Sequence, residues 1–253
     1  MAGAGVLLRK ELLEQWRTLR LPLSVVVFAL IGFSSPLLAR FTAEILKAVG
    51  GNLIPIELPP PTAADAIDQL AKNLTQLGAF VAILLAAGSV ATEKERGTAA
   101  LLLVRPVGRG GYLLAKLVAI GVTLGISVAV AVAAAWFYTA VLFEPLSVPG
   151  IVAAGVLDWL FLLAWAAVTF LASTLTRSAL AAAGIGVVAL ILVSILGIVP
   201  ALADWLPIGL VGVARSLALG LEHADPWKPV VGTIALIGLC VAIAWASFRR
   251  QEL

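Results

Sequence analysis

Two long runs without a charged residue, separated by one dense block of charge, constrain the fold of this chain most. Residues 73–92 and residues 117–143 contain no Asp, Glu, Lys or Arg. About twenty apolar residues are enough to cross the roughly 30 Å hydrocarbon core of a bilayer as an α-helix. The block between the runs, residues 92–116, is therefore predicted to be a water-facing connection between two membrane helices.

The composition extends this interpretation to the whole chain. Of its 253 residues 62% are hydrophobic and 12% are charged, whereas a soluble domain carries about 25% charged residues. The sequence thus predicts an integral membrane protein with one domain over residues 1–253 and almost no soluble part. The single cysteine, Cys240, excludes an intrachain disulfide, and the single histidine, His223, excludes a multi-histidine metal site.

Six apolar runs predict an all-α membrane protein with six transmembrane helices. Pro36 lies near the end of the first run, where a helix is about to stop. The polar segment that follows is expected to pack as a lid on the outer surface, with Thr62 as a helix N-cap and Asp65 in the first turn. Residues 200–227 hold an apolar stretch too short to cross, which predicts a re-entrant hairpin before the sixth span. The predicted spans are residues 21–38, 73–91, 117–143, 151–174, 178–199 and 229–248.

Residues 1–20 are predicted to form an interfacial helix. Leu8, Leu12, Trp16 and Leu19 follow a helical spacing, and charged residues fill the other positions. Such a helix lies flat on the membrane, with its tryptophan at the level of the lipid headgroups. The alternative, a signal peptide, is disfavoured because no small-residue cleavage site follows.

The distribution of basic residues predicts the orientation. Six spans place both termini on one side, and if that side is the cytoplasm, twelve of the seventeen Lys and Arg residues are cytoplasmic and five are outside. Basic residues concentrate in cytoplasmic loops. Both termini and the charged block are therefore expected in the cytoplasm, and the net charge of +3 does not indicate a nucleic-acid partner.

Motifs for catalysis are absent from the sequence. It contains no phosphate-binding Gly-x-x-x-x-Gly-Lys-Ser/Thr loop, no Gly-x-Ser-x-Gly and no His-Glu-x-x-His. We therefore expect no catalytic residue, no metal and no nucleotide bound by this chain.

Asp158 is the one ionisable residue inside a predicted span. It shares a helical face with Trp165, Thr169 and Ser173. A charge in mid-bilayer is costly and is expected to face protein or water. This face is therefore either one wall of a translocation path or a structural helix-to-helix contact.

The charged block has two interpretations from its spacing alone. Charge at its start and leucines at 101–103 suit a short amphipathic helix that docks into a groove on a soluble protein. An ordinary positive-inside loop without a partner has the same composition.

The residues of this block resemble a known family. Glu93-x-Glu95-x-Gly97-Thr98, followed by Leu101-Leu102, Pro106, Arg109 and Lys116, resembles the signature loop of the type-two ABC exporter permeases. The N-terminal helix with its Arg-Lys-Glu-Leu run, the six spans and the hairpin before the sixth span follow the same order of parts. Arg105, before Pro106, departs from the small hydroxyl residue expected there.

The resemblance implies a membrane subunit that is driven by another protein. Two copies, or this chain and a related permease, would pair with two copies of a cytosolic ATP-binding cassette ATPase, which binds the ATP and Mg²⁺. The loop at residues 92–116 would be the coupling helix docked on that ATPase, in a prokaryotic inner membrane. The residues implied for coupling are Glu93, Glu95, Arg96, Gly97, Thr98, Pro106 and Arg109; those implied for a gate helix are Arg9, Lys10, Glu11 and Trp16.

Two other functions stay open on the sequence. One is a secondary transporter that uses Asp158 as a proton or ion site, although no internal repeat supports it. The other is a membrane assembly factor that transports nothing. For an exporter, spans rich in Ala, Leu, Val and Trp favour a hydrophobic or amphipathic substrate.

Overall fold

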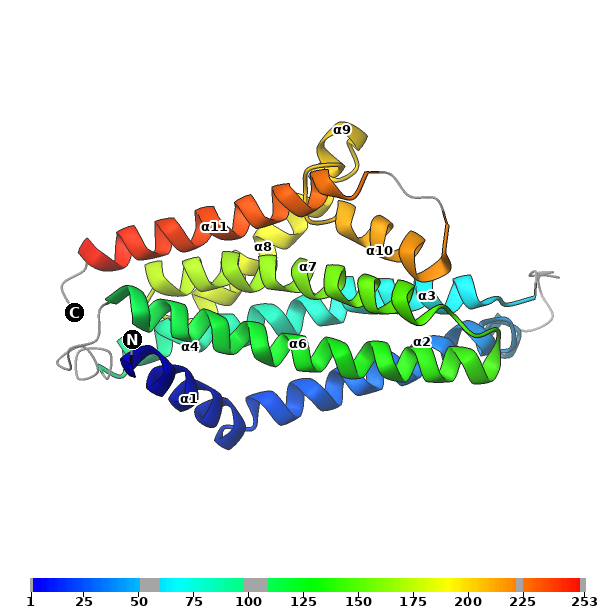
Figure 1. Cartoon of the computed structure of the whole chain (residues 1–253), viewed down its shortest axis with the longest axis horizontal. Helices are drawn as coiled ribbons and strands as arrows, with labels where there is room; N and C mark the ends of the chain where they lie inside the picture. Colours follow the sequence, from blue (N-terminus) through cyan, green and yellow to red (C-terminus); the bar gives the residue numbers. More distant parts are fainter. Residues whose placement is uncertain (1, 51–59, 98–108, 222–224, 251–253) are drawn as a thin grey trace.

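A computed structural model describes residues 2–50, 60–97, 109–221 and 225–250, and every regular element within these ranges is a helix (Figure 1). Six helical segments are long and apolar enough to cross a membrane: Arg20–Thr42, Ala63–Glu95, Gly110–Leu142, Val148–Leu175, Ala179–Leu196 and Trp227–Arg250. The predicted class, an all-α membrane protein with six spans, is confirmed. The elements are α1 (Ala2–Arg17), α2 (Arg20–Gly50), α3 (Ala63–Asn73), the π-helical turn η2 (Leu74–Gly78), α4 (Ala79–Glu95), α6 (Arg109–Leu142), α7 (Val148–Leu175), α8 (Ala179–Leu196), α9 (Pro200–Ala203), α10 (Gly209–Leu219) and α11 (Trp227–Arg250).

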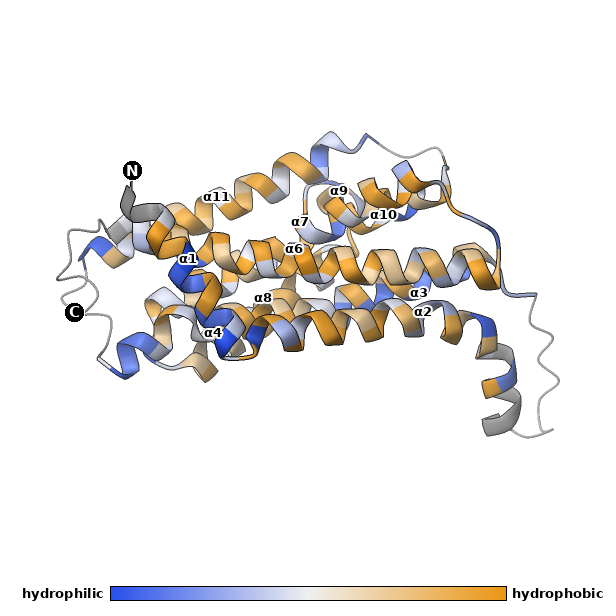
Figure 2. Ribbon diagram, turned by 60° about the horizontal axis from the view of Figure 1, so that its bottom comes forward, coloured by the Kyte–Doolittle hydropathy of each residue, from blue (hydrophilic) through white to orange (hydrophobic). Residues whose placement is uncertain are grey.

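The long helices run roughly along one axis, and α7 lies at the centre of the bundle. It contacts α4, α6, α8, α10 and α11, whereas α2 packs mainly on α6 and α3. α1 begins and α11 ends at the same end of the molecule (Figure 1). Apolar residues cover the lengths of the helices, and hydrophilic residues gather on α1 and at the helix ends (Figure 2). This distribution is the one expected of a bundle surrounded by lipid.

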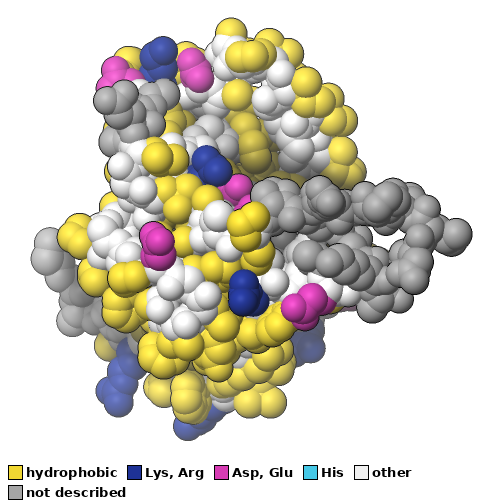
Figure 3. Space-filling model, turned by 90° about the vertical axis from the view of Figure 1, so that its right-hand side faces the viewer, with side chains coloured by type: hydrophobic (Ala, Val, Ile, Leu, Met, Phe, Trp, Pro, Cys, Tyr) yellow, Lys and Arg dark blue, Asp and Glu magenta, His cyan; other side chains and the backbone are white. Residues whose placement is uncertain are grey.

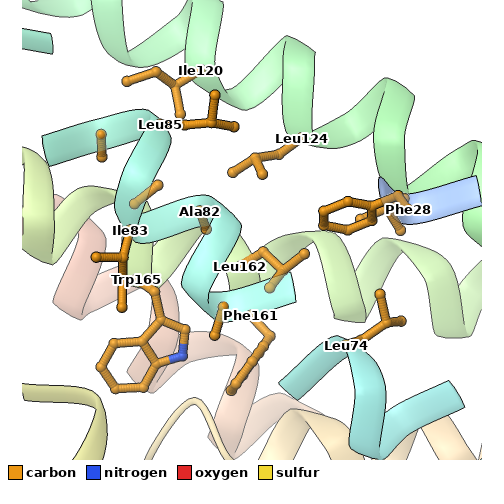
Figure 4. Packing of buried hydrophobic residues seen from close by; sticks show 14 of the residues in the cluster. Phe28, Leu74, Ala82, Ile83, Leu85, Ile120, Leu124, Phe161, Leu162 and Trp165 are labelled. Carbon is orange, nitrogen blue, oxygen red and sulfur yellow. The ribbon is translucent and has the colours of Figure 1, made fainter. Parts of the chain in front are cut away.

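The core lies between α2, α4, α6 and α7. Phe28, Leu74, Ile83, Leu124 and Trp165 are almost completely buried there (Figure 4). Lipid tails are as apolar as these side chains, so close van der Waals packing rather than exclusion of water must hold such helices together. Small residues permit that packing: a Cβ atom on Gly32 of α2 would lie 2.2 Å from the Ala131 carbonyl oxygen of α6.

The first span differs from its prediction at Pro36. The proline does not mark the end of the helix, because α2 continues to Gly50. Helix-forming residues such as Leu, Arg, Glu and Lys follow the proline and sustain the helix. A transmembrane helix also tolerates the loss of the one backbone hydrogen bond that proline cannot make. The first helix is therefore longer than its charge-free run.

The predicted N-cap at Thr62 is confirmed. The Thr62 backbone N–H donates to the Asp65 carboxylate at 2.8 Å, and α3 begins at the next residue. The apolar stripe of α3 is buried at Ile67 and Leu70. α3 then continues through η2 into α4, so this outer helix and the second span form one continuous helical run.

The end of the molecule far from the termini is closed by α3 and α10. Arg215 of α10 forms an ion pair with Asp68 of α3, and both of its contacting nitrogens donate to that carboxylate. Figure 3 views this end, where charged side chains are scattered among hydrophobic ones. Between α8 and α11 the chain forms two short helices, α9 and α10, neither of which is long enough to cross a membrane. Their placement within a membrane as a re-entrant hairpin stays a prediction.

Candidate functional site

The described part of the signature segment is the end of α4. The helix runs to Glu95, Arg96 is its C-cap, and Gly97 has a φ of +68°. Glycine adopts this left-handed conformation without strain and is the common residue just after a helix. The turn ends the helix directly after Glu93 and Glu95, so that Glu93 faces the bundle and Glu95 is exposed.

α1 approaches this helix end with its polar face. Leu19, with a φ of +61°, forms the sharp corner between α1 and α2. Glu11 and Gln15 of α1 are buried against the bundle, whereas Leu13 and Trp16 point outward and are about half exposed. The apolar side of the helix is thus free to face lipid, as an interfacial helix requires.

Side chains of α1, α4 and α6 meet in one charge cluster, which we define as Lys10, Glu11, Glu14, Glu93, Tyr112 and Lys116. Glu11, Tyr112 and Lys116 are buried at its centre, and Lys10 and Glu14 are partly exposed at its edge. The Lys116 ammonium lies 2.7 Å from Glu93 and 3.1 Å from Glu11. Lys10 lies 3.0 Å from Glu11 and 2.9 Å from Glu14. The Tyr112 hydroxyl donates to the Glu93 carboxylate. Three helices that are distant in sequence are therefore tied together by charged groups.

The electrostatics of the charge cluster depend on its pairing. Lys116 is only 3% exposed, and removing one partner of such a buried ion pair costs about 3–5 kcal/mol because the other charge is left unbalanced. Burial alone would lower the pKa of Lys10, but the hydrogen bonds and charges of Glu14 and Glu11 outweigh it and raise that pKa. Burial alone would raise the pKa of Glu14, and the bond to Lys10 reverses this, so that its pKa is lowered. Both groups are held in their charged forms.

Aromatic contacts extend the charge cluster to α11. The Tyr112 ring stacks on Phe248, with 5.7 Å between the ring centroids. Lys94, next to Glu93 in the sequence, lies over the same Phe248 ring at 5.8 Å and donates to the Thr174 carbonyl of α7. A displacement at the end of α4 would therefore act on α1, α6, α7 and α11.

A polar cavity of about 530 Å³ lies beside the charge cluster, between α1, the start of α2, α4 and α6. The carboxylates of Glu11, Glu14 and Glu93 lie within 4.8 Å of one another, an arrangement that could hold a cation. The ammonium groups of Lys10 and Lys116 lie among them and already supply positive charge. We therefore assign the three carboxylates to ion pairs.

The residues predicted for coupling and gating are placed in part. Glu93, Lys10 and Glu11 are brought together in the charge cluster, and Arg9, Glu95, Arg96 and Trp16 are exposed around it. Thr98 and Pro106 lie outside the described residues, as does the side chain of Arg109, at which α6 begins. The coupling helix itself thus stays a prediction.

The face of α7 predicted for a translocation path lies inside a single subunit. Asp158, Trp165, Thr169 and Ser173 are all buried. The Ser173 hydroxyl donates to the Ala87 carbonyl of α4 and accepts from the backbone N–H groups of Val90 and Ala91 in the same helix. These bonds hold α7 against α4. Within the described residues, the Trp165 indole N–H and the Thr169 hydroxyl have no hydrogen-bond partner. A role in translocation stays a prediction for these residues and would require α4 or α8 to move away from α7.

Sequence reasoning did not select several residues of this site. Tyr112 on α6, Glu14 on α1, and the buried hydrogen bond from Thr123 to Gln15 were missed as parts of the site. Lys116 of α6 was included in the signature segment, but its pairing with Glu11 and Glu93 was not predicted. One signal was available: Lys116 is a lone charge in front of a long apolar run. A lone ammonium group entering a membrane helix needs a buried carboxylate partner.

Comparisons with known proteins bear on the class of protein to which the chain belongs. The model of a family described as ABC-2 family transporter protein matches residues 6–253. An uncharacterized transmembrane protein, YxlG of Bacillus subtilis (strain 168), is 30% identical over 97% of each chain. A probable ABC transporter permease protein, NosY of Stutzerimonas stutzeri, is 33% identical over 60% of this chain and 49% of its own length.

Proposed function

Because the chain belongs to the ABC-2 family of transporter proteins and is the membrane permease subunit of an ABC transporter, we propose that it exports a hydrophobic or amphipathic substrate. The energy comes from ATP, which binds with Mg²⁺ to a separate cytosolic ATP-binding cassette ATPase. Two permease chains, two copies of this one or this one and a relative, assemble with two ATPase subunits. Both chain termini face the cytoplasm of a prokaryotic cell, and the complex lies in the inner membrane.

One observation carries the proposal: Glu93 joins the loop expected to receive the ATPase to two other helices, α1 and α6. Glu93 lies in the last turn of α4, which ends at Glu95, just before the loop. Its carboxylate pairs with Lys116 of α6. Lys116 in turn holds Glu11 of α1. A push on the loop would therefore move α1 and α6 together with the end of α4, because buried ion pairs resist separation.

The apolar character of the spans supports the substrate class. Asp158 is the only acidic residue of α7, and α8 carries no charged residue. Fixed charge for binding a bare ion is therefore scarce along the central helices, whereas apolar surface is abundant. Amphipathic or hydrophobic molecules match such walls.

A charge reversal in the exposed signature tests the proposal. The chain is co-purified with a candidate ATP-binding cassette ATPase from the same organism, and ATP hydrolysis is compared with that of the ATPase alone. Glu95→Lys should abolish stimulation, since Glu95 is exposed and would meet the ATPase with the wrong charge. Glu144→Lys is the matched control, because Glu144 is exposed at the opposite end of the bundle.

The two variants also define failure. Stimulation that survives Glu95→Lys, or that is lost equally in Glu144→Lys, would contradict docking at this segment. A chain that never co-purifies with an ATPase would contradict the exporter function itself.

A further inference from the structure

An apolar groove runs between α6 and α7 on the surface of the bundle, away from the charge cluster. Its volume is about 440 Å³, within the range of about 300–1,000 Å³ that is usual for ligand sites. Six residues from Gly125 to Trp136 line it on α6, and six from Val148 to Trp159 line it on α7. Both sets follow the same helical spacing, at offsets of 3, 4, 7, 8 and 11 from the first residue. The groove therefore follows one stripe on each of two antiparallel helices.

A tryptophan closes each end of the groove. Trp159 of α7 lies beside Gly125, and its indole N–H donates to the Gly121 carbonyl at 2.8 Å. At the other end, the Trp136 indole N–H donates to the Leu146 carbonyl at 3.1 Å. Both polar tips are thus satisfied by the protein, and the rings present apolar surface.

The groove offers a ligand only dispersion contacts. No lining residue carries a charge, a hydroxyl group or an amide side chain. Small residues such as Gly125, Ala129 and Gly155 create the hollow, whereas Val128 is buried beneath it and Val152 is exposed at its rim. An unfilled hollow of this kind forfeits van der Waals contacts for the atoms that line it. An apolar chain is therefore the ligand that these walls stabilise.

The length and position of the groove indicate which apolar molecule would occupy it. Eleven residues of helix rise span about 16 Å, and one leaflet of a roughly 30 Å hydrocarbon core is about 15 Å thick. The lining residues occupy the halves of α6 and α7 that lie away from the chain termini, and the groove stops at Trp159, near the middle of both helices. We propose that this groove binds one acyl chain of a membrane phospholipid from the leaflet opposite the termini.

A helix from a second copy fits the groove less well. An α-helix with its side chains is about 10–12 Å across, and a crossing helix would need a groove along the whole span. This groove covers only half of the span, because the Trp159 ring closes it near the middle of α6 and α7. The hydrogen bond from the Trp159 indole to the Gly121 carbonyl fixes the position of that ring. A flexible chain that ends at the bilayer midplane has no such conflict.

The test uses the full-length chain without ATPase or nucleotide, so its outcome is independent of the proposed transport. The chain is reconstituted with a phospholipid that carries a diazirine midway along one acyl chain, extracted into detergent, washed, irradiated and mapped by mass spectrometry. We expect cross-links concentrated on residues 125–136 and 148–159. Ala129→Phe should reduce these cross-links about tenfold, because the introduced phenyl ring fills the hollow that the acyl chain would occupy.

Matched variants separate binding from general lipid contact. Ile126 is exposed on α6 but does not line the groove, so Ile126→Phe should keep the labelling. Val152→Phe, on the opposite rim, should repeat the loss seen with Ala129→Phe, and a thermal melt of each variant reports on its folding. Labelling spread evenly over exposed faces such as α8, or equal labelling in Ala129→Phe and Ile126→Phe, would overturn the proposal. So would cross-links between two chains through the groove, which would identify a second copy as its occupant.

Discussion

At the scale of single residues, Lys116 does most to hold the candidate site together. Its ammonium group pairs with Glu11 of α1 at 3.1 Å and with Glu93 of α4 at 2.7 Å, and it lies over the Tyr112 ring at 5.1 Å. Lys10 reaches the same two carboxylates at 3.0 Å and 3.9 Å, but its side chain is 40% exposed. A buried charge of this kind is costly unless each partner stays in place. The three helices are therefore expected to keep one fixed arrangement as long as the ammonium group is present.

Replacing Lys116 by methionine tests that dependence. Lys116→Met removes the buried partner of Glu11 and Glu93 and leaves them only the partly exposed Lys10. It should lower the free energy of unfolding by about 3–5 kcal/mol, measured by SDS titration in mixed micelles. Combining it with Glu11→Gln should recover part of that loss, with a coupling of about 0.5–3 kcal/mol in a double-mutant cycle. Lys228→Met is the control: Lys228 pairs with Asp204 at 3.7 Å and both are exposed, so it should cost about 0–1 kcal/mol. Equal losses for Lys116→Met and Lys228→Met would contradict the role of Lys116.

Which residues meet in the site could be predicted only in part. The signature segment identified Glu93, and the charged face of the first helix identified Lys10 and Glu11. The pairing of Glu11 with Lys116 joins positions 105 residues apart, and the spacing within one helix carries no information about such a partner. Tyr112 gave no signal at all, because a tyrosine near a membrane surface is usually an interfacial anchor.

At the scale of elements, α2 and α6 cross closely at Gly32. A Cβ atom there would lie 2.2 Å from the Ala131 carbonyl oxygen, and a backbone atom cannot move aside as a side chain can.

The variant Gly32→Ala should push α2 and α6 apart. We expect it to lower the free energy of unfolding by about 1–3 kcal/mol, as overpacking does. Gly184→Ala in α8 meets no atom within 4 Å and should instead stabilise its helix by about 1 kcal/mol. Thermal melting of the two purified variants makes the comparison, and a Gly32→Ala variant as stable as Gly184→Ala would refute the close crossing.

Helices were easier to predict than their ends. The six long helices and the cap at Thr62 followed from apolar runs and capping chemistry. The end of α2 did not, because Pro36 interrupts one hydrogen bond while the residues on both sides favour helix. Charge-free runs report the apolar length of a helix, and helices continue beyond it when the next residues have high helix propensity.

At the scale of the whole molecule, the two ends of the bundle should differ in their access from the two sides of the membrane. We expect Glu95→Cys to react with an impermeant maleimide only in inverted vesicles, and Glu144→Cys only in intact cells. Both positions are exposed, at opposite ends of the bundle, and the native Cys240 is buried. The reverse pattern of labelling would contradict the orientation predicted from the basic residues.

The Lys116 ion pairs are buried, so they should respond less to ionic strength than exposed contacts between the permease and its ATPase. At 1 M salt the Debye length falls to about 3 Å, and charges in contact with water lose most of their attraction, whereas buried pairs are screened far less. The contacts that we propose for exposed Glu95 and Arg96 with the ATPase would belong to the first kind, and the Lys116 pairs belong to the second. Concentrated salt should therefore strip the ATPase from the membrane while α1 stays bound to α6, leaving an isolated permease whose internal linkage is intact.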